Sequence, residues 1–276
     1  MSEPVWVRRA LIGVAVAFLG ILILMPAAAV FSEALRKGFS FYVASIRDPL
    51  ALAALRLTLL TAGVTLAANL LFGLSASWLV AKFDFPGRSL LLSLIDLPFA
   101  VSPVISGLIF ILLFGARGWF GPALNEHGIQ IVFATPGVIL ATVFVTFPFI
   151  ARELIPLMQE QGGEEEEAAV LLGASGWQTF RRVTLPNIRW ALAYGIVLAN
   201  ARAMGEFGAV SVVSGHIRGR TNTLPLHVEI LYNEYNFSAA FAVASLLMFL
   251  ALVTLAVKTA LEWRIRAEQR PIEGGS

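Results

Sequence analysis

The chain has 276 residues, of which 58% are hydrophobic and 14% charged, and its formal net charge is +2. Soluble domains carry about 25% charged residues, so this composition argues against a soluble domain and predicts an all-α polytopic membrane protein. The basic residues are scattered over the expected loops and indicate no nucleic-acid site, and the absence of cysteine excludes disulfides, thiolate metal sites and cysteine catalysis.

The first apolar run has two readings, a cleaved secretion signal or a membrane span. Arg8 and Arg9 precede the run, and the small residues at 26–29 imitate a cleavage site. The apolar part of a signal peptide has about 7–15 residues, whereas this run extends from Leu11 to Phe31. The greater length favours an uncleaved first helix.

Five further runs are long enough to cross a bilayer, which takes about 20 apolar residues. We predict six spans, near residues 11–31, 56–81, 89–114, 135–157, 187–214 and 237–261. The excess of Lys and Arg on one side places both termini, and the loop between the fourth and fifth spans, in the cytoplasm.

The third predicted span contains polar groups. Asp96 lies beside Pro98 and before Pro103, and prolines free backbone carbonyls inside a helix. We expect Asp96 to be a structural intramembrane residue that caps a broken helix. Ser102 and Ser106 are neutral donors and are candidates to line a polar pathway.

A charged segment, EEEEAAVLLGASGWQTFRRVTLPN (164–187), joins the fourth and fifth predicted spans. Its four glutamates suit a helix N-terminus, whose dipole favours acidic groups by about 0.3–1 kcal/mol each. The pattern predicts a helix over Glu164–Leu172, a stop at Gly173, a second short helix over about 175–182, and Pro186 as the start of the fifth span. These properties alone are also those of a solvated connecting loop.

The spacing in this segment resembles the EAA loop of ABC-importer permease subunits: Glu-Ala-Ala, three residues, Gly, nine residues, Ile, one residue, Leu-Pro. In this chain Glu167-Ala168-Ala169 precedes Gly173, Leu185-Pro186 closes the pattern, and Val183 replaces the Ile. In that family the loop forms coupling helices that sit in a groove of a cytoplasmic ATPase. The resemblance implies a coupling role for Glu167, Ala168, Ala169, Gly173, Leu185 and Pro186.

Further stretches, at 83–108, 144–156, 171–192 and 200–219, are similar to the CysW family of sulfate/thiosulfate permease subunits. The resemblance covers roughly residues 50 to 262 and implies the type I ABC importer permease fold with six transmembrane helices. It divides the chain into an N-terminal helix with a periplasmic loop (1–54), a permease domain (55–262) and a short cytoplasmic tail (263–276).

The same resemblance implies the partners and the location. They are a CysT-type permease subunit, two CysA-type ATPase subunits and a periplasmic sulfate- or thiosulfate-binding protein, assembled in the lipid of a bacterial inner membrane. The chain has no Gly-Lys dipeptide and hence no Walker A loop. We therefore expect no cofactor and no catalytic site in this chain, with ATP and Mg²⁺ held by the partner ATPase.

Arg202 and Glu206 are ionisable residues in the fifth predicted span, four positions apart and so on one helical face. A charge at the bilayer centre costs about 2.5–3.5 kcal/mol on insertion scales. Two readings stay open: a mutual ion pair inside the bundle, or an arginine that attracts a sulfate dianion and is held by the glutamate. Asn200 is a weaker candidate on the same face.

The three histidines, at 127, 216 and 227, fall in expected outer loops without metal-ligand spacing, so no metal site is expected. We predict a permease subunit of an ATP-driven importer for sulfate or thiosulfate. The alternatives are a permease for another oxyanion such as molybdate, which would be more apt to homodimerise, and, more remotely, an ATP-independent secondary transporter or a membrane scaffold.

Overall fold

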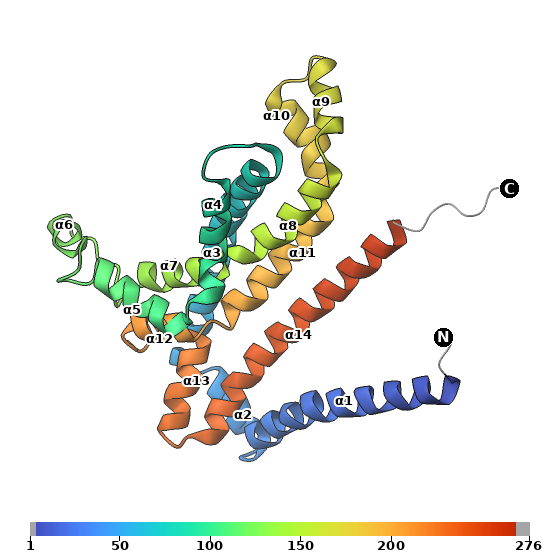
Figure 1. The fold of residues 1–276 in the computed structure, drawn as a ribbon. Coiled ribbons are helices and arrows are strands. Elements are labelled where there is room, and N and C mark those ends of the chain that lie inside the picture. The colour runs from blue at the N-terminus through green and yellow to red at the C-terminus, as the bar shows by residue number, and fades with distance from the viewer. Residues whose placement is uncertain (1–3, 269–276) are drawn as a thin grey trace.

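A computed structural model describes residues 4–268, which form helices joined by short loops and contain no strand (Figure 1). Four helical stretches in this part are long and apolar enough to cross a membrane. They are α1 (Val5–Leu35), α3 (Pro49–Lys82), α7 (Thr135–Thr146) continued by α8 (Pro148–Gln161), and α14 (Phe237–Glu268). All four coincide with predicted spans, which confirms the all-α fold class.

The other two predicted spans are bent pairs of helices. The first pair, α4 (Arg88–Ala100) and α5 (Pro103–Phe114), meets at 111°. In the second, a helix over Gly176–Met204 meets α12 (Gly208–Ser214) at 50°. The broken helix expected in the span over 89–114 is therefore present, whereas the span over 187–214, expected as one helix, is interrupted. Six spans result within residues 4–268 only if each bent pair is counted as one span.

Local sequence explains where α3 begins. The side chain of Asp48 accepts hydrogen bonds from the backbone N–H groups of Leu50 (2.8 Å) and Ala51 (3.3 Å), and Pro49 occupies the first turn. This is an N-cap followed by a proline that has no N–H to leave unpaired. Because the helix begins this early, Arg56, the first residue of the predicted span, lies well inside α3.

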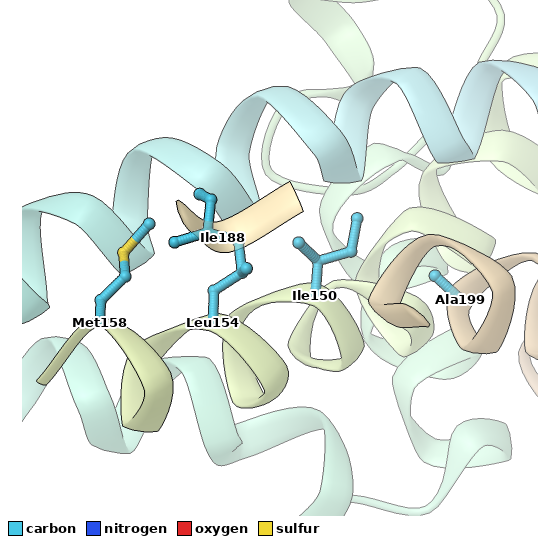
Figure 2. Close-up of a cluster of buried hydrophobic side chains, with 5 residues drawn as sticks. All are labelled: Ile150, Leu154, Met158, Ile188 and Ala199. Carbon is cyan, nitrogen blue, oxygen red and sulfur yellow. The ribbon is translucent and has the colours of Figure 1, made fainter. Parts of the chain in front are cut away.

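The centre of the bundle is built by α3, α8 and α11 (Leu185–Met204). Ile150, Leu154 and Met158 of α8 form a buried cluster with residues of α11 (Figure 2). A Cβ on Gly73 of α3 would lie 3.0 Å from Ile150, and a Cβ on Gly195 of α11 would lie 3.2 Å from it. Glycine at these positions lets the three helices approach closely, as small residues do in membrane bundles.

Three short helices complete the end of the molecule where α12 lies: α2 (Phe39–Ile46), α6 (Gly121–Glu126) and α13 (Leu224–Asn233). The segment expected to be an outer loop at 216–236 thus contains α13, whose backbone N–H at Leu224 donates to the Thr58 hydroxyl of α3 at 2.8 Å. The opposite end consists of α9 (Glu164–Leu171) and α10 (Gly176–Thr179), which project beyond the other helices (Figure 1). α1 packs on α14 and is otherwise almost entirely exposed.

The predicted tail over 263–276 lies partly outside the described residues. α14 continues as a helix through Glu268, so the first part of that segment extends the last span.

Candidate coupling surface and translocation site

The 164–187 segment folds as a helix, a glycine turn and a second helix. Gly173 has φ +87°, a left-handed conformation that suits glycine, and its N–H donates to the Val170 carbonyl at 2.9 Å. Ser175 then caps α10 in a capping box with Gln178. The helix–glycine–helix prediction is confirmed, with α9 ending one residue early, at Leu171.

The predicted helix start at Pro186 is partly wrong. A π-helical turn, η1 (Phe180–Thr184), joins α10 to α11, so the second short helix runs into the fifth span without a break. The N–H of Leu185 reaches back five residues to the Phe180 carbonyl. Pro186 lies in the first turn of α11 as expected. Proline has no N–H to donate, and the wider hydrogen-bonding pattern of the π turn accommodates the missing hydrogen bond.

The projecting helices expose both charge and apolar surface. Glu167 and Ala168 are exposed, whereas Ala169 is half-buried. Leu171 and Leu172 are 87% and 90% exposed beside them, at the turn that leads to Gly173. Contiguous exposed apolar residues at a polar end of a membrane protein are typical of a surface that another protein covers.

A cavity of about 540 Å³ lies under α9, between it, the end of α3 and the second helix. Trp78 and Phe83 contribute apolar walls, and Glu166 and Thr184 contribute polar ones. The 164–187 segment, the candidate coupling segment, therefore offers a projecting edge with a cavity next to it.

The two helix breaks of the bent spans lie against each other. A Cβ on Gly107 of α5 would lie 2.8 Å from the Ala209 carbonyl oxygen of α12. A Cβ on Gly208 would lie 2.9 Å from the Cβ of Pro103. Both glycines permit an approach that alanine would block. Broken helices at membrane depth are tolerated where the freed backbone groups are buried in protein or line a cavity, and such breaks form the binding sites of many transporters.

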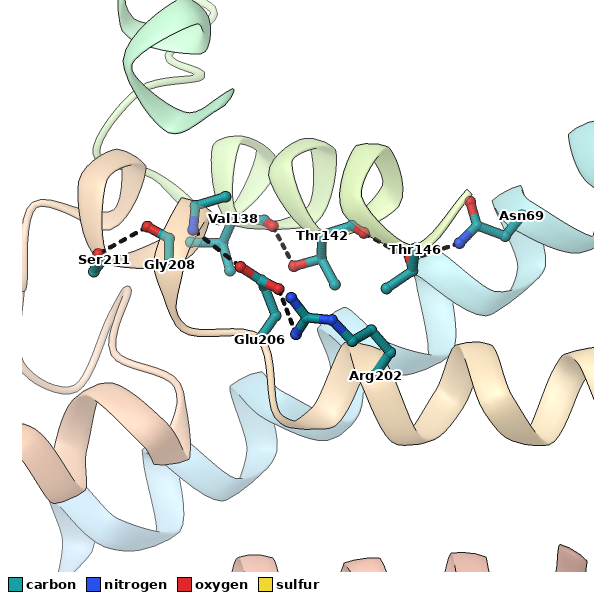
Figure 3. A network of polar contacts seen from close by, with 9 residues as sticks. Asn69, Val138, Thr142, Thr146, Arg202, Glu206, Gly208 and Ser211 are labelled. Carbon is teal, nitrogen blue, oxygen red and sulfur yellow. Dashed lines mark hydrogen bonds and ion pairs between the residues drawn. The ribbon is translucent and has the colours of Figure 1, made fainter. Parts of the chain in front are cut away.

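Arg202 and Glu206 meet at the second break. The Arg202 Nη1 lies 2.7 Å from the Glu206 Oε2, and the other carboxylate oxygen accepts the Ala209 N–H at 2.9 Å (Figure 3). The Glu206 side chain is 1% exposed and that of Arg202 is 34% exposed. α11 ends at Met204, so the two residues do not share one continuous helix as predicted. Glu206 follows the helix end and accepts the N–H of Ala209 in the first turn of α12, whose N-cap residue is Phe207.

A line of buried polar groups passes beside this pair. Asn69 of α3 donates to the Thr146 hydroxyl of α7 at 2.7 Å, and Thr146 donates to the Thr142 carbonyl at 2.6 Å (Figure 3). Sequence analysis missed these residues because neutral polar side chains leave an apolar run intact. One signal was available: Thr58, Thr61, Thr65 and Asn69 recur at helical spacing and share the buried face of α3.

The neutral pathway candidates take different positions. Ser102 is exposed at the first break, whereas the buried hydroxyl of Ser106 donates to the Ser102 carbonyl at 3.2 Å. The amide of Asn200 lies 4.0 Å from the Met204 sulfur. Ser102 is thus presented at a break, while Ser106 and Asn200 make contacts within their own helices.

Asp96 does not cap the break in the third span. The break falls at Val101 and Ser102, one turn later, and Asp96 instead pairs with Arg152 of α8 at 2.9 Å. The Arg152 guanidinium also lies over the Phe99 ring, 4.3 Å from its centroid. Arg152 falls inside the predicted span over 135–157, and sequence analysis missed both this charge and its pairing with Asp96.

The Asp96–Arg152 pair is expected to contribute little to stability. Both side chains are about half-exposed, and exposed ion pairs contribute about 0–1 kcal/mol. We predict that Asp96→Asn shifts the thermal midpoint of the purified chain much less than a substitution of the enclosed Glu206. A thermal scan in detergent measures both, and an equal loss of stability in the two variants would contradict this prediction.

The histidines form no cluster. His227 is buried in α13, not in a loop as expected, and burial lowers its pKa against the opposing effect of Asp48. His216 lies 3.4 Å from the Glu229 carboxylate, and His127 follows α6. Among residues 4–268 no group of three or more His, Asp and Glu side chains could hold a metal ion.

Comparison with known proteins identifies the family. Residues 69–267 match the protein family described as "Binding-protein-dependent transport system inner membrane component". The chain is 51% identical over 270 residues to the sulfate transport system permease protein CysW of Escherichia coli (strain K12), covering 98% of this chain and 93% of that protein. It is 35% identical over 244 residues to the CysT permease protein of the same organism, covering 88% of each.

A solved structure shares the fold. It is a bacterial alginate ABC transporter in complex with an alginate pentasaccharide-bound periplasmic protein, with a TM-score of 0.75, 17% identity, and coverage of 98% of this chain and 96% of that one. The fold, the family description and the CysW similarity agree. The chain belongs to the family of binding-protein-dependent transport system inner membrane components, in its CysW branch of sulfate permease subunits.

Proposed function

We propose that this chain is a permease subunit of an ATP-driven importer that moves sulfate or thiosulfate across a bacterial inner membrane. The observation that carries the proposal is the 51% identity, over nearly the whole chain, to a protein named as a sulfate transport permease. The same similarity makes molybdate and an ATP-independent carrier less favoured. Both termini, in this proposal, lie in the cytoplasm with the coupling segment.

The chain works as one of two permease subunits, with a CysT-type partner. Two CysA-type ATPase subunits, which hold ATP and Mg²⁺, dock on the exposed surface formed by Glu167, Ala168 and the neighbouring leucines. A periplasmic sulfate- or thiosulfate-binding protein delivers the anion. The exposed charge and the exposed Leu171 and Leu172 support the docking role, because such a surface is stable only when it is covered.

The movement of the ATPase carries the coupling helices with it and switches the permease pair between inward-open and outward-open states. Gly173 keeps α9 and α10 at a fixed turn, and the unbroken path through η1 into α11 connects Leu185 and Pro186 directly to the fifth span. This chain makes and breaks no bonds itself.

The anion path, in this proposal, passes the two adjacent helix breaks. Arg202 supplies positive potential there, and Glu206 holds the guanidinium and moderates its field, since transport needs release as well as binding. Ser102 offers a neutral hydroxyl at the other break. Ser106 and Asn200 make side-chain contacts with neighbouring residues of their own helices, which favours a supporting role for these two residues.

Purification of the complex tests this proposal. We expect an affinity-tagged copy of the chain to isolate a second, different permease and an ATPase. Sulfate with its binding protein should then stimulate ATP hydrolysis by the reconstituted complex, and molybdate should not. A complex with a single permease species and molybdate-stimulated hydrolysis would overturn the substrate assignment.

A further inference from the structure

The four consecutive glutamates of α9 do not share one role. Glu167 is exposed, whereas the Glu166 side chain is only 20% exposed and turns back toward the membrane helices. One oxygen of its carboxylate, Oε1, lies 2.9 Å from the Lys82 ammonium and accepts the Thr184 hydroxyl at 3.1 Å. The family motif begins at Glu167, so this inward contact belongs to a residue outside it.

The contact joins three segments that are distant in sequence. Lys82 is the last residue of α3, Glu166 lies in the first turn of α9, and Thr184 is the last residue of the π-helical turn. The Lys82 side chain is 11% exposed and also donates to the Gly162 carbonyl at the turn before α9. Lys82 therefore holds the beginning of the coupling segment at two points.

The π-helical turn gives Thr184 its place in the cluster. Thr184 is 2% exposed and lines the cavity under α9 together with Glu166. The extra residue in this turn changes which side chains of the α10–α11 helix face α9. The π-helical turn thus lies where Thr184 contacts Glu166 of α9.

A second tie runs in parallel. Glu165 accepts a hydrogen bond from the Asn187 amide of α11, and the Gln161 amide of α8 donates to the Asn187 carbonyl at 3.3 Å. Two adjacent glutamates thus hold α9 to two different membrane helices, Glu166 to α3 and Glu165 to α11. The following residue, Glu167, is exposed and makes neither of these contacts.

We propose that Lys82, Glu166 and Thr184 are positioning residues that fasten the coupling helices to the cytoplasmic end of α3, so that movement of the ATPase is transmitted to the membrane helices. This inference rests on the proposed function. A docked helix transmits force only to structures to which it is firmly attached. The Lys82 and Glu166 side chains are only 11% and 20% exposed, so this ion pair is shielded from water more than a surface pair and resists separation.

Exchange of the charges of Lys82 and Glu166 in the reconstituted complex tests this attachment of the coupling helices to α3, called the anchor below. Lys82→Glu and Glu166→Lys each place like charges together, and we expect each to lower the sulfate taken up per ATP hydrolysed by about tenfold. ATPase co-purification and basal hydrolysis should be retained, because the outward face of α9 is unchanged. The double variant restores the opposite charges and should recover most of the transport per ATP. Lys82→Arg should also retain it.

The matched control is Glu160→Lys, the same charge change at an exposed position in the last turn of α8. It should leave transport per ATP unchanged. Normal coupling in both single reversals, or a double variant no better than the product of the singles, would overturn the anchor. A structural defect without a coupling role would lower complex yield and leave transport per ATP intact, which also overturns it.

A readout independent of transport separates this inference from the proposed function. Cleavage at the exposed Arg181 and Arg182 by an arginine-specific protease, which does not cut at lysine, should be faster in each single reversal and return to the original rate in the double variant. If the unsubstituted complex fails to take up sulfate, the proposed function fails, and the proteolysis rates still decide whether the anchor exists. Equal rates in all variants would refute the anchor.

Discussion

Replacing Arg202 with glutamine is expected to lower sulfate uptake by about tenfold or more, because it removes the positive charge at the helix breaks and leaves a buried carboxylate unpaired. Glu206 is 1% exposed and has Arg202 as its ion-pair partner at 2.7 Å. Loss of one partner of a buried pair costs about 3–5 kcal/mol. The loss of stability in Arg202→Gln is expected near the lower end of this range, since the Arg202 side chain is 34% exposed. Uptake and thermal stability should both be measured.

A neutral pair separates the two contributions. In Arg202→Gln/Glu206→Gln no charge is left unpaired, and the carboxamide oxygen of the new residue can still accept the Ala209 N–H. We expect this variant to regain stability and membrane abundance while uptake remains low, because the anion still lacks a cationic group on its path. Full recovery of uptake would leave Arg202 with a packing role only and would contradict the proposed pathway.

Glu167→Lys is expected to reduce uptake by about tenfold or more while the chain remains inserted in the membrane. The side chain is exposed on the proposed docking surface, so reversal of its charge is expected to oppose the partner surface that, in this proposal, receives the glutamate. Membrane abundance by immunoblot, ATPase co-purification and uptake are the measurements. Loss of ATPase from the purified complex should accompany the loss of uptake.

The exposed Glu160 again supplies the control, because Glu160→Lys makes the same charge change outside the coupling segment. Glu167→Gln should lie between the original chain and the reversal. Intact uptake in Glu167→Lys would show that the surface is not a docking site and would favour an ATP-independent carrier.

The coupling segment was predictable from sequence because its signals are local. Glycine at 173, the acidic first turn of α9 and the Ser175 cap each act within a few residues, and the predicted helices appear nearly at their predicted bounds. The class of fold was predictable for a similar reason, since hydrophobic length alone indicates a membrane span.

The candidate translocation site was only partly predictable. Pro98 and Pro103 predicted a broken helix in the third span, and the break lies at 101–102. The break at 205–207 interrupts sequence that stays apolar on both sides, so hydrophobic length did not reveal it. The packing of the two breaks against each other, through Gly107 with Ala209 and Gly208 with Pro103, joins residues far apart in the chain and was not predictable from local sequence. The same limit hid the ties between Asp96 and Arg152 and between Lys82 and Glu166, which join residues far apart in the chain.

The central claim, an ATPase-coupled permease for sulfate, is tested most directly by uptake of radiolabelled sulfate into cells that lack this chain, with and without a restored copy. We predict that uptake is lost without the chain, returns with the original copy, and does not return with the Glu167→Lys copy at equal membrane abundance. Uptake that is unchanged by deletion of the chain, or that returns fully with Glu167→Lys, would contradict the account.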